Sequence, residues 1–158
     1  MSICIYPGSF DPITMGHLDI ITRGSEMFDT VIVCVLVNTQ KTPAFSLQKR
    51  LSMIRESVKH LNNVSVDSFS GLLVDYMEQK KADIILRGLR AVSDFEHEFA
   101  MAAMNHQLKP EVETVFLMTR TKYSFLSSSV IREVAGFGGD VSGLVPDAIL
   151  DDIKHLKK

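Results

Sequence analysis

The amino-acid sequence predicts an α/β protein with a doubly wound, five-stranded parallel sheet. Five short runs rich in β-branched residues alternate with segments of helical spacing, and such alternation favours right-handed parallel crossovers. Residues 31–37 read VIVCVLV and are apolar throughout, which is typical of a strand covered on both faces. With 158 residues and 46% hydrophobic content, residues 1–158 are expected to form a single domain around one core.

The expected elements follow one another in strict alternation over most of the chain. Strands are predicted at residues 3–6, 31–37, 64–66, 84–86 and 115–117. Helices are predicted at residues 16–28, 47–61, 72–80, 93–109 and 128–135, and a last one opens at Pro146. In such a sheet, ligands bind beyond the carboxyl ends of the strands, at the point where strand order reverses.

Two of these helices carry recognisable start or stop signals. Leu47, Leu51 and Ile54 begin an apolar stripe with helical spacing behind Ser46, which is a favoured N-cap residue. Ser93 and Glu96 have the spacing of a capping box, and Pro110 is expected to end that helix.

Composition excludes several classes of function. The formal net charge of −2 argues against a surface that neutralises a nucleic-acid backbone, so small-molecule substrates are expected. The sequence contains no apolar run long enough to cross a bilayer and no basic segment leading into an apolar one at its start. We therefore expect a cytoplasmic protein without a membrane partner. Cys4 and Cys34 lie in apolar strands and are expected to be buried free thiols.

The loop after the first strand, residues 6–17, carries polar groups suited to phosphate. It holds the Ser9 hydroxyl and leads into a helix near Gly16 and His17. A helix N-terminus presents unpaired N–H groups and a positive dipole end, and glycine lets a phosphate approach the backbone. His17 could therefore donate a hydrogen bond to a phosphoryl oxygen.

Two further loops supply cations. Lys41 follows the second strand, where it could be either a solvated surface lysine or a ligand for a substrate anion. Arg87, Gly88 and Arg90 are expected in a loop directly after the strand at 84–86. Their guanidiniums suit bidentate contacts with phosphate.

The fourth loop ends in three successive serines at a predicted helix start. Ser127, Ser128 and Ser129 would supply hydroxyls and free backbone N–H groups, which form another anion site or, alternatively, an ordinary N-cap.

Taken in order, these segments resemble one enzyme family. The matching motifs are GSFDP followed by TMGH (residues 8–17), RGLRAVSDFEHE (residues 87–98) and FLSSSVIRE (residues 125–133). The sequence is similar to the bacterial phosphopantetheine adenylyltransferases, nucleotidyltransferases of the TxGH or HxGH type. The resemblance implies a Rossmann-like nucleotidyltransferase fold and transfer of the adenylyl group of ATP to 4′-phosphopantetheine, giving dephospho-coenzyme A and pyrophosphate in coenzyme A biosynthesis.

The resemblance also implies a role for individual residues. It makes His17 and Lys41 the stabilisers of the reacting phosphates, and it places phosphopantetheine against Ser9, Lys41, Leu73 and Arg87. It places ATP against Ser9, Phe10, His17, Gly88, Leu89, Arg90, Glu98, Tyr123, Ser124, Phe125, Leu126, Ser127, Ser128 and Ser129. Mg²⁺ is expected with the triphosphate and not in a cage of protein ligands, and a homohexamer is implied.

Two alternatives remain open from the sequence. The first is a related transferase that adenylates nicotinamide mononucleotide or moves CMP onto glycerol phosphate, although such chains usually have His where Thr14 stands. The second is an ATP-binding sensor without catalysis. The presence or absence of turnover with each acceptor would distinguish them.

Overall fold

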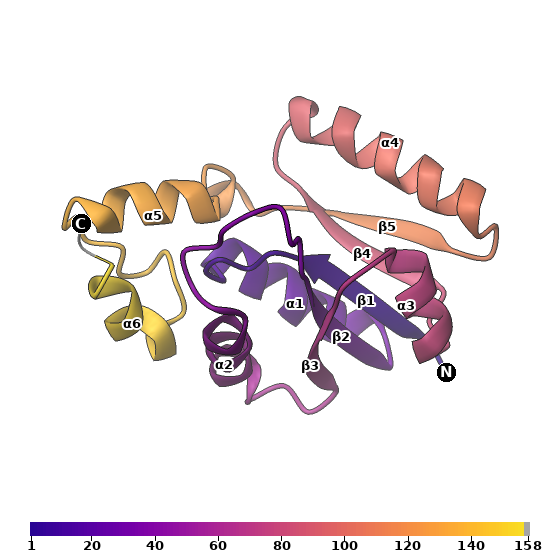
Figure 1. The fold of residues 1–158 in the computed structure, drawn as a ribbon, viewed down its shortest axis with the longest axis horizontal. Coiled ribbons are helices and arrows are strands. Elements are labelled where there is room, and N and C mark those ends of the chain that lie inside the picture. The colour runs from indigo at the N-terminus through magenta and orange to yellow at the C-terminus, as the bar shows by residue number, and fades with distance from the viewer. Residues whose placement is uncertain (157–158) are drawn as a thin grey trace.

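A computed structural model describes residues 1–156, apart from the side chains of Val92 and Ser93. Its centre is a five-stranded, all-parallel sheet of β1 (Ile3–Gly8), β2 (Thr30–Leu36), β3 (Val64–Phe69), β4 (Ile84–Leu89) and β5 (Glu113–Met118) in the order β3-β2-β1-β4-β5 (Figure 1). This arrangement confirms the predicted fold class. Strand order reverses between β1 and β4, so their carboxyl ends define the switch point.

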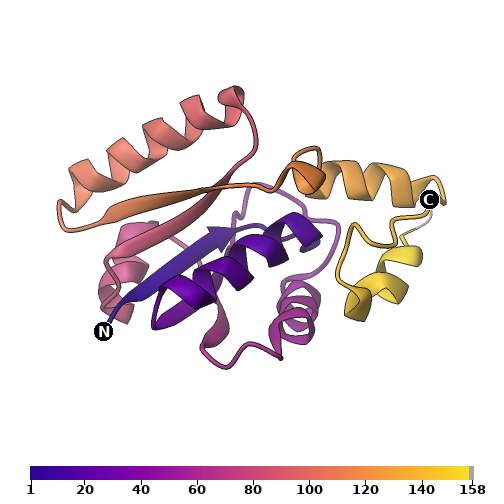
Figure 2. The ribbon, with the colours of Figure 1, turned by 180° about the vertical axis from the view of Figure 1, so that it is seen from behind.

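The helices cover both faces of the sheet. They are α1 (Met15–Met27), α2 (Leu47–Val58), α3 (Leu73–Lys80), α4 (Val92–Leu108), α5 (Ser128–Gly136) and α6 (Leu150–Lys154), with short 3₁₀ turns at Thr121–Tyr123 and Asp147–Ile149. The larger core cluster joins α1, α2, α5 and α6 to one face, and a smaller one joins α3 to the other. Figure 2 shows α1 crossing in front of the sheet on its larger-core side.

The predicted boundaries differ from the observed ones at two informative places. Ser46 caps α2 as expected, since its side chain accepts a hydrogen bond from the Lys49 backbone N–H. The expected capping box at Ser93 is wrong, because α4 begins at Val92 with Ala91 in the cap position and without a side-chain cap. Ser93 itself has a side chain outside the described part of the structure.

The fourth strand is longer than predicted. Residues 87–89 are the end of β4, where Arg87 pairs with Phe116 in the register of β5, so they are not in a loop. The sequence pattern ended the strand at Leu86 because the charged Arg87 ends the apolar run and glycine is depleted in strands, but pairing with β5 overrides that local pattern.

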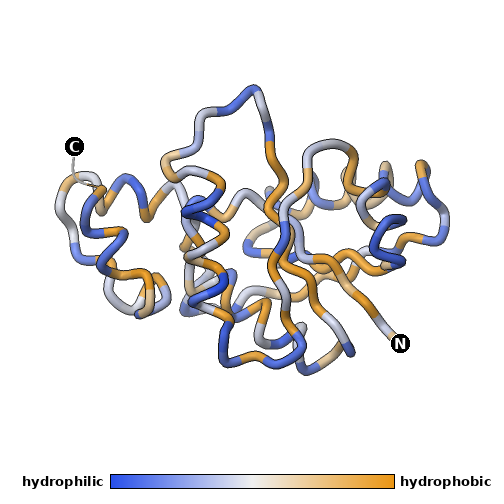
Figure 3. The backbone as a smooth tube through the Cα atoms, turned by 60° about the horizontal axis from the view of Figure 1, so that its bottom comes forward, coloured by the Kyte–Doolittle hydropathy of each residue, from blue (hydrophilic) through white to orange (hydrophobic). Residues whose placement is uncertain are grey.

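Burial in the sheet follows the hydropathy pattern. Cys4 and Cys34 are free and fully buried, as predicted, and the tube that leads away from the N-terminus through β1 is mostly orange in the hydropathy view of Figure 3. In the described chain no helix combines the length and apolar character needed to span a membrane.

The two central strands separate toward their carboxyl ends. Between β1 and β4 only Cys4 with Ile84 and Ile5 with Ile85 are in register, although both strands continue beyond these pairs. The sheet therefore opens at the switch point, and side chains from both strands can enter the gap.

Candidate active site

A cleft of about 740 Å³ lies at the carboxyl ends of the strands. It is bounded by the end of β1, the loop from Asn38 to Pro43, the end of β4 and the start of α5. Predicted site residues that line it are Ser9, Phe10, His17, Lys41, Arg87, Gly88, Arg90, Glu98, Tyr123, Leu126, Ser127, Ser128 and Ser129. The fold thus gathers segments more than a hundred residues apart into one cleft.

Four predicted residues lie outside this lining. Leu73 packs against the smaller core cluster at the start of α3. Leu89 is next to the cleft residue Gly88 on β4, where successive side chains point to opposite sides of a strand. Ser124 and Phe125 follow the 3₁₀ turn, and the Phe125 side chain is exposed to solvent.

His17 is fixed by a reciprocal cap at the start of α1. Its backbone N–H donates to the Thr14 hydroxyl at 3.3 Å, and its Nδ1 accepts the Thr14 backbone N–H at 3.0 Å. Because Nδ1 is the acceptor, a neutral ring carries its proton on Nε2. Among the described residues none hydrogen-bonds to Nε2, and no buried side-chain nitrogen or oxygen lacks a partner, so Nε2 is not a buried atom. Nε2 is therefore open to the cleft that His17 lines.

The environment of His17 keeps its ring neutral. Loss of hydration, followed by the nearby charges of Arg87 and Arg90, lowers the pKa of His17 from 6.5 to about 3. The imidazole therefore stays neutral near neutral pH, and its Nε2–H can donate a hydrogen bond.

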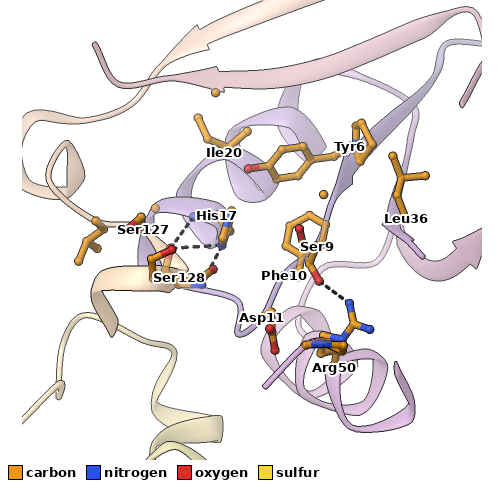
Figure 4. Close-up of a pocket in the computed structure, with 18 of the residues that line it drawn as sticks. Tyr6, Ser9, Phe10, Asp11, His17, Ile20, Leu36, Arg50, Ser127 and Ser128 are labelled. Atoms are coloured by element: carbon orange, nitrogen blue, oxygen red, sulfur yellow. Dashed lines mark hydrogen bonds between the residues drawn. The ribbon is translucent and has the colours of Figure 1, made fainter. Parts of the chain in front are cut away.

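Two aromatic rings hold this imidazole in place. Phe10 lies edge-on to His17 with ring centroids 4.9 Å apart, and Tyr6 lies edge-on to Phe10 at 5.3 Å (Figure 4). Phe10 adopts a left-handed backbone conformation, with φ of 47°, which is uncommon for an aromatic residue and is maintained here by its burial. Tyr6 was not predicted as a site residue. Burial raises the pKa of its hydroxyl to about 12, so it stays protonated.

Arg87 and Glu98 form a bidentate ion pair inside the cleft. Arg87 Nε and Nη2 donate to the two Glu98 oxygens at 2.8 and 2.5 Å, and Nη1 donates to the Pro7 carbonyl at 2.5 Å across the gap between β1 and β4. Although desolvation lowers it, the pKa of Arg87 is raised on balance by the hydrogen bond and charge of Glu98. The pair fixes one edge of the guanidinium and leaves further N–H groups for an anion.

Arg90 is anchored in a similar way beside the fourth loop. Its Nε donates to Asp94 at 3.0 Å, and its Nη1 donates to the Leu126 carbonyl at 2.6 Å. This second bond ties the end of β4 to the segment that leads into α5.

The serines have distinct roles at the start of α5. Ser127 is the N-cap and accepts from the Val130 N–H at 3.2 Å, whereas Ser128 donates to the Pro12 carbonyl at 2.7 Å. Ser127 is thus an N-cap, as one alternative for this motif expects, and the start of the helix also faces the cleft. The anion site at the start of α5 stays a prediction, based on the N–H groups that a helix start leaves free.

The structure adds residues that the sequence pattern did not assign. Asp11 and Arg132 belong to the motifs already quoted, but no role was predicted for them, and Arg50 had no signal because an arginine on a helix reads as a surface residue. Arg50 is only 6% exposed and donates to the Ser9 and Phe45 carbonyls at 3.0 and 3.1 Å (Figure 4).

The carboxylates that line the cleft all have partners. Glu98 and Asp94 are paired with arginines, and Asp11 accepts two backbone N–H bonds. No group of three or more metal-ligating side chains occurs among the residues the structure describes. This donor set does not fit a metal ion held by the protein alone.

Comparison with known proteins places the chain in a family. The model of the cytidylyltransferase-like family matches residues 5–134. A solved structure from Vibrio parahaemolyticus, assigned provisionally as a nicotinate-nucleotide adenylyltransferase, has the same fold, with a TM-score of 0.71, 19% identity, and coverage of 100% of this chain and 98% of the other. The chain belongs to the cytidylyltransferase-like family, a class of nucleotidyltransferases.

Curated relatives narrow the class. A protein from Clostridium botulinum strain Eklund 17B is 56% identical over 100% of this chain and 99% of its own length, and one from Synechocystis is 61% identical over 96% and 95%. Both are named phosphopantetheine adenylyltransferase, as is a protein from Heliobacterium modesticaldum that is 58% identical over 95% of this chain and 89% of its own. Within its class, the chain belongs to the phosphopantetheine adenylyltransferases.

Proposed function

We propose that this enzyme transfers the adenylyl group of ATP to 4′-phosphopantetheine, with dephospho-coenzyme A and pyrophosphate as products. One observation carries the proposal beyond family membership. The residues predicted for ATP, such as His17 and Ser129, and those predicted for the acceptor, such as Lys41 and Arg87, line the same cleft. A cleft of this volume suits two small substrates held side by side.

The proposed reaction is a direct displacement. An oxygen of the phosphopantetheine phosphate attacks the α-phosphorus of ATP, the new P–O bond forms, and the bond from the α-phosphorus to the bridging oxygen of pyrophosphate breaks. The two reactants are anions, and unit charges about 4 Å apart repel by roughly 4 kcal/mol at an effective dielectric of 20. The chain therefore needs fixed cations and donors more than a nucleophile.

Particular residues are proposed to meet that need. The Nε2–H of His17 would donate to an oxygen of the α-phosphate, where negative charge grows in the transition state. Lys41 would screen the acceptor phosphate and Arg87 would bind it through the N–H groups that Glu98 leaves free. The start of α5 and Arg90 would bind the phosphates of ATP.

Mg²⁺ is proposed to arrive with ATP. Since the described carboxylates of the cleft are already paired, the ion would be bound chiefly through the triphosphate. When bound, it neutralises part of the phosphate charge.

We also propose that the enzyme is a homohexamer and works in the cytoplasm. Large apolar side chains gather on α4, which lies at the periphery of the molecule in Figure 1, and among them Phe99 and Met104 are 59% and 55% exposed. Apolar patches of this kind mark protein interfaces, and further copies of this chain are the proposed partners. Light scattering should give six times 17.6 kDa, and Phe99→Glu should reduce it.

The activity is tested with ATP and Mg²⁺ plus 4′-phosphopantetheine, nicotinamide mononucleotide or no acceptor. Of the three mixtures, only the one that contains phosphopantetheine should release pyrophosphate, and mass spectrometry should find dephospho-coenzyme A in it. Release with nicotinamide mononucleotide would support the other transferase instead. ATP binding without turnover in any mixture would support the sensor.

A further inference from the structure

The Asp11 carboxylate lies where two loops of the cleft meet. It is buried, with 9% of its side chain exposed. Its Oδ2 accepts the Ala44 backbone N–H at 2.8 Å, and its Oδ1 accepts the Phe45 backbone N–H at 2.9 Å. Both oxygens are therefore used to hold a segment 33 and 34 residues away in the chain.

The segment that Asp11 holds is the base of the loop that carries Lys41. That loop connects β2 to α2, and residues 38–44 are exposed to solvent. Within the described residues 38–43 the hydrogen bonds are local, from the Lys41 N–H to the Asn38 carbonyl and from the Gln40 N–H to the Asn38 side chain. The position of Lys41 relative to the sheet consequently depends on the point where the loop is attached.

Arg50 strengthens the same attachment from α2. Its Nε donates to the Phe45 carbonyl and its Nη1 to the Ser9 carbonyl. The base of the loop is thus fixed through both the N–H and the carbonyl of Phe45, and both connections lead to residues 9–11 at the end of β1.

Arg132 connects Asp11 to the opposite side of the cleft. Its Nη1 donates to the Asp11 backbone carbonyl at 2.6 Å and lies 3.7 Å from the carboxylate. Arg132 is on α5, whose start carries the serines predicted to bind ATP. One residue therefore contacts the loop assigned to the acceptor and the helix assigned to ATP.

We infer that Asp11 is a positioning residue that sets where Lys41 stands relative to the bound phosphates. This inference rests on the proposed function, because it assumes that Lys41 screens the acceptor phosphate. Asp11 is not proposed to touch a reacting atom. Its effect on turnover passes through Lys41, so it should disappear when Lys41 is absent.

Asp11→Asn is the variant that tests this role with least change in size. An amide oxygen can accept one of the two backbone N–H groups, but the amide nitrogen is a donor and cannot accept the other. One of the two attachments is lost. Since a displacement of about 1 Å can cost about a hundredfold in rate, we expect kcat to fall by about tenfold to a hundredfold.

The experiment is a double-mutant cycle with Asp11→Asn and Lys41→Ala. The constants kcat and KM are measured for both substrates in the four proteins. Asp11→Asn should lower kcat in the wild-type background and change it less than twofold in the Lys41→Ala background. Equal factors in both backgrounds, or an unchanged kcat in Asp11→Asn alone, would overturn the inference.

Two further variants provide a matched control and a replacement for Asp11→Asn. Asp67→Asn is the matched control, because the Asp67 carboxylate also accepts two hydrogen bonds, from the Ser68 backbone N–H and the Tyr76 hydroxyl, but lies outside the cleft lining. The kcat of this variant should stay within twofold of wild type. If Asp11→Asn does not fold, Ala44→Pro removes one donor from the exposed side of the same attachment and should show the same dependence on Lys41. Inactive wild-type protein would instead count against the proposed function.

Discussion

Replacing His17 separates two jobs that the structure gives to one imidazole. Nδ1 accepts the backbone N–H of Thr14 and so closes the cap of α1, while Nε2 is open to the cleft. His17→Ala removes both functions. His17→Gln keeps an acceptor at the third helical position, which is where a capping box places Gln or Glu.

Loss of the cap lowers stability, and loss of the donor lowers the rate. Thr14 is 2% exposed, so without His17 its N–H stays buried and unpaired, at a cost of about 1–3 kcal/mol. For a chain of this length each kcal/mol lowers Tm by about 2–4 °C. Loss of one donor aimed at developing charge costs about 10²–10³ in kcat.

The assay combines thermal unfolding with steady-state kinetics. We expect His17→Ala to lower Tm by about 2–4 °C for each of the 1–3 kcal/mol lost, and to lower kcat by about 10²–10³. His17→Gln should keep a Tm near that of wild type while still losing at least tenfold in kcat. The dissociation constant for ATP should change less than threefold in both, because the bond is strongest in the transition state.

Two results would contradict these two roles of His17. Full recovery of kcat in His17→Gln would mean that the imidazole matters only as a helix cap. Equal losses in ATP affinity and kcat would make it an ordinary binding residue that stabilises ground state and transition state alike.

The remaining predictions concern pH, packing and the acceptor site. The pKa of His17 falls from 6.5 to about 3 in the fold, first through burial, so the stability linked to its neutral form is complete above pH 6.5 and is lost as pH falls toward 3. Denaturant titrations should show this extra loss of stability in acid for wild type but not for His17→Gln. ¹⁵N NMR at pH 5.5 should find a neutral ring with its proton on Nε2, instead of a titration near pH 6.5. Gly24→Ala would place a Cβ 2.6 Å from Leu86 Cδ2 and should lower stability by about 1–3 kcal/mol, whereas unchanged Tm would show that the contact relaxes freely. Arg87→Lys cannot reproduce the bidentate bond to Glu98, so KM for phosphopantetheine should rise by about tenfold or more with KM for ATP within twofold, and an equal rise in both would contradict the assignment.

The fold could be predicted because its signals are local and repeated. The apolar run of β2 and the stripe of α2 behind Ser46 each follow from side-chain period and capping. The end of β4 could not, since Arg87 ends the apolar run and Gly88 is a poor strand residue; both extend β4 only because β5 pairs with them. Long-range pairing of this kind leaves no mark in the local pattern.

The candidate site shows the same contrast between local signals and long-range contacts. The positions of His17, Lys41 and Arg87 in the cleft lining could be predicted, because side chains suited to phosphate follow or end strands there; their roles stay predictions. Asp11 and Arg50 act instead on backbone groups of distant residues, and their partners at Ala44, Phe45 and Ser9 are peptide groups that every residue type carries.

The side chains that bind backbone groups can therefore be identified only from the folded structure. The last shared pair of β1 and β4 is Ile5 with Ile85, and beyond it the sheet no longer holds its two central strand ends together. The Arg87 bond to the Pro7 carbonyl spans that gap on one side, and Asp11 attaches the neighbouring loop on the other. Where the two strands diverge, no ladder hydrogen bonds join one to the other, so side chains must supply the bonds between the two walls of the cleft. The polar residues of such a cleft are therefore expected to include some that bind backbone groups as well as those that bind substrate.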